Sequence, residues 1–234
     1  MWEPNFKDLK EFHCLAPDLP GHGQSSHIGA LPTNELVKLL AEIIQAHSKD
    51  KTAHVVGLSY GGVIAQALIS DRPDLIKRVI LSGTSAKISP FMQAVFRIYI
   101  GLNKPILRLF PAEFIGKMIS IQFGIPKQYL STLAEDMKRV DPDVMADYLL
   151  SSYMDVQTPI HTDKEVLVIA GENETPFAKT MARRLTRQIP SAVGIFIPNA
   201  GHVWNLQKPD LFARVVRWWF SGESIDMDWI QPIS

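Results

Sequence analysis

The sequence predicts an α/β protein in which a mostly parallel sheet is flanked by helices. Short apolar runs, bounded by Gly, Pro or Asp, recur at residues 12–18, 53–59, 78–84, 165–172 and 193–201. Nearly continuous apolar strands are typical of a parallel sheet that is covered on both faces. Helical patterns accompany these runs at residues 33–48, 176–189 and 208–220. Strands that alternate with helices indicate the α/β class.

One segment, residues 86–160, interrupts this alternation. It contains no convincing strand but many Phe, Ile, Leu and Met residues at helical spacings. At about 75 residues it is far longer than an ordinary connection between a helix and a strand. We therefore predict a helical cap inserted into a core formed by residues 1–85 and 161–234. Its apolar residues are expected to form the cap's own core or the wall of a pocket: Phe91, Phe96, Ile100, Leu107, Phe110, Phe114 and Met118.

The composition argues against several classes of protein. Lys and Arg number 24, as do Asp and Glu, so no excess of positive charge points to a nucleic-acid partner. The single cysteine, Cys14, cannot form an internal disulfide. The amino-terminal stretch lacks the apolar run of a signal peptide, and no run reaches the ~20 residues of a membrane-spanning helix. We expect a cytoplasmic protein with no membrane and no nucleic acid as partner.

Ser59 is the candidate nucleophile. It lies between Gly57 and Gly61, at the point where a predicted strand gives way to a predicted helix. A nucleophile at the tip of such a tight turn needs small neighbours, because the chain folds back closely around it. The N–H of Tyr60, at the start of the helix, can then stabilise negative charge on a tetrahedral intermediate. The alternative is a serine that only caps the helix.

A serine hydroxyl needs a base to take its proton and an acid to orient that base. His202 follows a predicted strand and precedes the last helix, and an imidazole that titrates near neutrality suits the role of base. The acid is expected in the loop after the strand at 165–172. There Glu174 is the first choice and Glu172 the reserve. The alternative for either residue is an ordinary surface carboxylate.

With these residues in place, the chain resembles the α/β-hydrolase superfamily. The matching stretches, in chain order, are APDLPGHGQS, GLSYGG, RPDLIKRVILSGT, VLVIAGENETP and IPNAGHVWNLQKPDLF. The family usually has Asp where Glu174 stands. The resemblance implies a serine hydrolase that forms an acyl-enzyme and needs no metal or organic cofactor. The implied substrate is an ester, thioester or activated carbon–carbon bond of a small to medium apolar acyl compound.

The chain departs from the family at its amino end. The resemblance would place two strands, and a third with a His-Gly motif that donates the second oxyanion N–H, before residue 1. The only His-Gly pair here is His22-Gly23, in a later loop. Three outcomes are open: a longer natural protein, direct pairing of residues 12–18 with 53–59, or a strand supplied by a partner chain in a homodimer. We expect a weak or inactive hydrolase, and the alternative function is a non-catalytic ligand-binding protein on the same fold.

Overall fold

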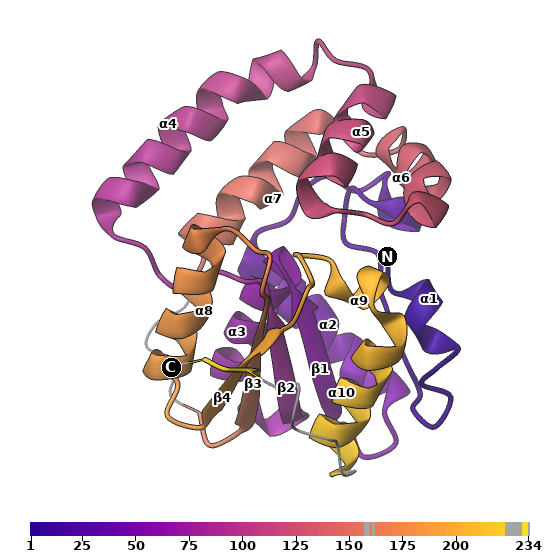
Figure 1. The fold of residues 1–234 in the computed structure, drawn as a ribbon, viewed down its shortest axis with the longest axis vertical. Coiled ribbons are helices and arrows are strands. Elements are labelled where there is room, and N and C mark those ends of the chain that lie inside the picture. Colours follow the sequence, from indigo (N-terminus) through magenta and orange to yellow (C-terminus); the bar gives the residue numbers. More distant parts are fainter. Residues whose placement is uncertain (157–159, 161, 223–230, 234) are drawn as a thin grey trace.

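The computed structural model describes residues 1–156, 160, 162–222 and 231–233. Four parallel strands form the sheet in chain order (Figure 1): β1 Ala53–Leu58, β2 Ile76–Ser82, β3 Glu165–Gly171 and β4 Ala192–Ile197. A two-residue strand, β5 Gln231–Pro232, pairs antiparallel with β4. The predicted α/β class with a mostly parallel sheet is therefore confirmed.

Helices cover both faces of this sheet. The helices α2 Thr33–His47, α3 Tyr60–Asp71 and α8 Pro176–Gln188 share one hydrophobic cluster with the sheet. The helix α10 Pro209–Ser221, with the short helices α1 Glu3–Phe6 and α9 Trp204–Gln207, lies on the other face. The three helices predicted from helical patterns, at 33–48, 176–189 and 208–220, are thus confirmed to within one residue at each end.

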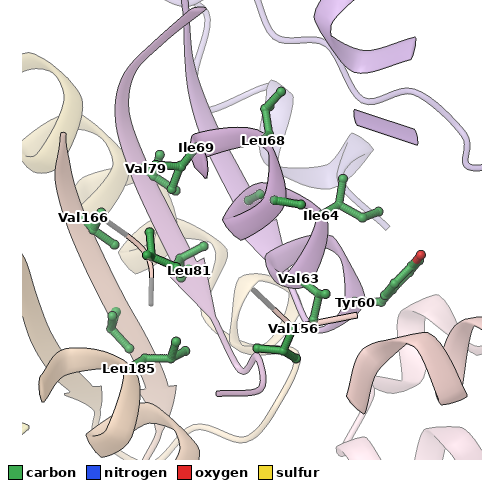
Figure 2. Close-up of a cluster of buried hydrophobic side chains, with 14 of the residues drawn as sticks. Tyr60, Val63, Ile64, Leu68, Ile69, Val79, Leu81, Val156, Val166 and Leu185 are labelled. Carbon is green, nitrogen blue, oxygen red and sulfur yellow. The ribbon is translucent and has the colours of Figure 1, made fainter. Parts of the chain in front are cut away.

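Strand β2 shows how the apolar runs serve both layers. Val79 and Leu81 pack into the cluster with α2, α3 and α8, whereas Ile80 between them packs with α10. Successive side chains of a strand point to opposite faces, so a strand covered on both sides must be apolar throughout. Figure 2 shows part of the first cluster, where Ile69 of α3 lies beside Val79 of β2.

The predicted strand at residues 12–18 is wrong. This segment has no strand conformation, and β1 pairs only with β2 among the described residues. A cavity of about 400 Å³ is lined by Phe12, Cys14 and Ala16 together with Ala53 and Val56 of β1, so the two segments do not pair directly. An extended apolar segment becomes a strand only when a neighbouring strand bonds its backbone, and no strand in the described part of the chain does so here.

Four helices follow β2 and lie together at one end of the molecule (Figure 1): α4 Pro90–Leu107, α5 Ala112–Phe123, α6 Leu130–Met137 and α7 Pro142–Met154. Single-turn 3₁₀ helices lie at Gly23–Ser25, Pro73–Leu75 and Lys127–Tyr129. The predicted boundary at 160/161 stays a prediction, and residues 157–159 and 161 lie outside the described residues. No helix in the described part of the chain has the length and apolar character needed to cross a bilayer.

The apolar residues of this segment do not all behave as expected. Ile100 is buried, and Phe96 stacks on Tyr153 of α7 with ring centroids 4.2 Å apart. In contrast, four positions expected in a core or a pocket wall are exposed: Phe91, Phe110, Phe114 and Met118. Several apolar side chains of these four helices therefore face outward. The side chain of Leu107 lies outside the described residues.

Candidate active site

Ser59 is held in a strained conformation between β1 and α3. Its φ is 56° and its ψ is −120°, a combination that costs a residue with a side chain on the order of 1–3 kcal/mol. Its N–H donates to the carbonyl oxygen of Ser82 at the end of β2, 2.9 Å away. A Cβ at Gly57 would lie 2.4 Å from the Gly61 carbonyl oxygen, which explains why the turn needs glycine there. The chain is thus shaped to present the Ser59 side chain.

His202 and Glu174 meet at the carboxyl ends of the strands. His202 lies in the loop after β4, and Glu174 lies in the loop after β3. The imidazole Nδ1 is 3.1 Å from Oε2 of Glu174, and the two side chains are only 15% and 4% exposed. Because Nδ1 faces the carboxylate, Nε2 is the ring nitrogen left to exchange a proton with another group.

Glu172, the reserve acid, has a different partner. Its Oε2 accepts the backbone N–H of Asn199 at 2.8 Å. It therefore holds the loop after β4, while Glu174 is the carboxylate that contacts His202. Of the two acids named from the sequence, the structure brings Glu174 to the histidine.

Three residues around His202 were missed by the sequence reasoning. A Cβ at Gly83 would lie 2.8 Å from Nδ1 of His202 and 3.1 Å from Oε1 of Glu174, so this glycine leaves room for the pair. The ring of Phe123 stacks on the imidazole with centroids 4.7 Å apart. Oε1 of Gln207 accepts the Gly201 N–H at 2.7 Å, next to His202 in the chain.

The Gln207 side chain also joins the histidine loop to the helices above the sheet. Its Nε2 donates to the carbonyl oxygens of Phe123, at 3.1 Å, and of Gly124, at 2.9 Å. Gly124 ends α5 in the left-handed conformation, which is a common helix stop. The glycine itself is the sequence signal for this helix end. Nothing in the sequence shows that the ring of Phe123, the residue before it, contacts His202.

Tyr60 is the first residue of α3, so its N–H has no carbonyl of its own helix to bond. Its phenol is 3.0 Å from the Thr33 hydroxyl, which donates to Asp155 at 2.7 Å. The ring also stacks on Tyr148 of α7. Burial raises the pKa of the Tyr60 phenol to about 12. The Tyr60 side chain therefore stays protonated and anchors the turn, while its backbone N–H is not bonded by α3.

A cavity of about 740 Å³ brings these groups together. Ser59, Glu174 and His202 line it from the sheet side. Apolar side chains complete the lining from several helices: Ile121, Phe123, Leu149, Tyr153, Phe177 and Met181. Neither His22 nor Gly23 occurs among the described residues that line it.

A strained serine between a strand and a helix, followed along the chain by an acid loop and a histidine loop on a mostly parallel sheet, defines the class of α/β hydrolases. The comparison with known families agrees. Residues 1–215 match the profile described as "Alpha/beta hydrolase family", and the chain belongs to that family of hydrolases.

Several proteins are similar to this chain. A protein of Gibberella zeae named "AB hydrolase superfamily protein" is 28% identical over 225 residues, which cover 92% of this chain and 72% of that protein. The (E)-2-((N-methylformamido)methylene)succinate hydrolase of Acinetobacter baylyi is 24% identical, over 93% of this chain and 84% of its own. The solved structure of MenH from S. aureus has a TM-score of 0.79 at 22% identity, covering 94% and 88% of the two chains, which shows a shared fold.

Proposed function

We propose that this chain is a serine hydrolase that works through an acyl-enzyme. The observation that carries the proposal is the buried contact between His202 and Glu174, which lines one cavity with the strained Ser59. A serine, an imidazole and a carboxylate in this chain order are the groups that nucleophilic acyl transfer requires.

In the proposed reaction, Ser59 Oγ attacks the substrate carbonyl carbon as its proton passes to Nε2 of His202. The tetrahedral intermediate collapses, and the leaving group departs with the proton from His202. Water then gives a proton to the same nitrogen and attacks the acyl carbon. The acyl–Oγ bond breaks, the carboxylic acid leaves, and the proton returns to Ser59. Throughout the cycle, Glu174 orients the imidazole and stabilises its cationic form.

The proposed substrate is an ester, thioester or activated carbon–carbon bond of a small to medium apolar acyl compound. The cavity volume of about 740 Å³ falls within the range that suits small molecules, roughly 300–1,000 Å³. The cavity is lined by both polar and apolar side chains. We propose that the acyl chain packs against apolar side chains such as Phe123 and Phe177, with the reacting carbonyl beside Ser59.

The proposed oxyanion donor is the backbone N–H of Tyr60, the first residue of α3. No carbonyl of its own helix bonds this N–H, so it can stabilise negative charge on the tetrahedral intermediate.

The test is pre-steady-state hydrolysis of p-nitrophenyl acetate, butyrate and octanoate. We expect an initial release of p-nitrophenolate that matches the amount of enzyme, followed by slower turnover. Ser59→Ala should lose both phases, whereas the control Ser70→Ala, on the far end of α3, should keep both. Turnover that persists in Ser59→Ala would refute the proposal. A wild-type protein that binds the esters but never releases p-nitrophenolate would instead be a ligand-binding protein.

A further inference from the structure

Helix α4 exposes an apolar stripe along its outer side. Phe91, Val95, Ile98 and Leu102 follow one another at intervals of four, three and four residues, and Tyr99 lies beside them. These five side chains are between 42% and 75% exposed. The same spacing repeats in the seams of coiled coils, where it places side chains on one narrow strip of the helix. We refer to these five residues as the α4 stripe.

The opposite side of α4 packs against the rest of the chain. The helix packs against α7, as Figure 1 shows. Its two charged residues are engaged there, since Lys104 pairs with Asp147 at 2.7 Å and Arg97 donates to the sulfur of Met154 at 3.7 Å. Surface helices normally turn their polar side to solvent. In α4 the charged side chains contact α7, and the apolar stripe faces outward.

The area of the α4 stripe fits a specific interface. Large side chains expose about 200 Å² each when free, so the stripe exposes on the order of 600 Å². Apolar side chains scattered singly over a surface need no explanation, but contiguous patches of this size mark interaction sites. Two such stripes packed face to face would bury about 1,200 Å², the lower limit for specific protein–protein interfaces.

We propose that the α4 stripe is the dimer interface of this protein, and that its partner is the same stripe of a second copy. A stripe that packs on itself about a two-fold axis is self-complementary, as an isologous dimer requires. Helix-on-helix packing also explains the narrow spacing of four, three and four residues. Because Lys104 is neutralised by Asp147, no free lysine on α4 favours an anionic lipid surface over a second helix.

The first test is sedimentation equilibrium across a range of protein concentrations. The wild type should form a dimer, and Ile98→Glu should weaken association by at least about 30-fold, because it places a charge at the centre of the interface. The control is Met118→Glu, which adds the same charge to an exposed apolar position of α5 outside the stripe and should leave association unchanged. Circular dichroism and thermal melting establish that each variant is folded.

The second test is a cross-link that does not depend on destabilising the dimer. Ile98 lies near the middle of the α4 stripe, so a two-fold axis brings its two copies together. In a Cys14→Ser background, Ile98→Cys should give a disulfide-linked dimer under mild oxidation, and Met118→Cys should not.

Three results would overturn the proposal. The first is a wild type that remains monomeric at 100 μM, and the second is equal loss of association in Ile98→Glu and Met118→Glu. The third is a monomer that binds vesicles of phosphatidylcholine and phosphatidylglycerol and loses this binding in Ile98→Glu. That result would assign the stripe to a membrane surface. None of these measurements depends on hydrolase activity.

Discussion

Replacement of Glu174 by Gln is the sharpest test of how the candidate site is oriented. The carboxylate is 4% exposed and lies 3.1 Å from Nδ1 of His202, so it faces the ring with little screening by water. Opposite charges at about 4 Å with an effective dielectric constant near 20 attract by roughly 4 kcal/mol. That attraction stabilises the imidazolium formed when Ser59 gives up its proton. Its loss should lower kcat about 10³-fold, at roughly 1.4 kcal/mol for each factor of ten.

The side-chain amide of the Glu174→Gln variant should lower kcat through a second effect. If the new NH₂ group donates to Nδ1, the ring proton moves to Nε2, which then cannot accept the proton of Ser59. The assay is the initial release of p-nitrophenolate from p-nitrophenyl acetate, with Glu172→Gln as the matched control. Glu172 bonds the Asn199 N–H instead of the histidine, so its variant should keep acylation within about threefold. A large loss in Glu172→Gln together with normal acylation in Glu174→Gln would refute the assignment.

Three further predictions concern residues around the site and the sheet edge. Tyr60→Phe keeps the backbone N–H but loses the contact with the Thr33 hydroxyl, so urea unfolding should show a loss of about 1 kcal/mol while kcat changes less than threefold. Gln207→Met removes the link from Gly201 to the end of α5, and a misplaced His202 should lower the acylation rate about tenfold. Burial lowers the pKa of His54 from 6.5 to about 4, so the unfolded chain binds more protons between these values. The free energy of unfolding should therefore fall by about 1–2 kcal/mol, after allowance for screening at a half-buried ring, as the pH drops from 6.5 to 4. Urea titrations of His54→Gln at the same pH values should lack this dependence, and an equal fall in both proteins would contradict it.

The sequence was most informative about features that depend on the residues of a single strand or helix. The runs at 53–59, 78–84 and 165–172 are apolar enough to be covered on both faces, and each overlaps a strand of the sheet. Residues 12–18 have a similar composition but form no strand. Strand formation depends on a neighbour that shares hydrogen bonds, and a local pattern of residues does not reveal that neighbour.

The same limit applies to the candidate site. The order of Ser59, Glu174 and His202 along the chain could be read directly, and so could a strained turn rich in glycine. The choice between Glu174 and Glu172 rested on loop position alone, because two carboxylates two residues apart look alike in a sequence. The contacts of Phe123 with His202 and with Gln207 join residues about 80 positions apart, and only the folded chain shows them.

The sequence likewise did not show that the apolar residues of the α4 stripe face outward. Phe91 fits a core as well as it fits an interface, because the spacing of residues fixes the relative direction of side chains and not what covers them. In the structure Phe91 is 75% exposed, while Ile100 on the other side of the same helix is 6% exposed.

The most direct test of the central claim is the intact mass of the protein after reaction with a fluorophosphonate. The Ser59 oxygen would displace fluoride from phosphorus, with His202 taking the serine proton, and the reaction does not require the acyl-enzyme to be hydrolysed. We predict a single adduct, located by peptide mapping on Ser59 and absent from Ser59→Ala. A folded wild-type protein that acquires no adduct, or an adduct that persists in Ser59→Ala, would contradict the account.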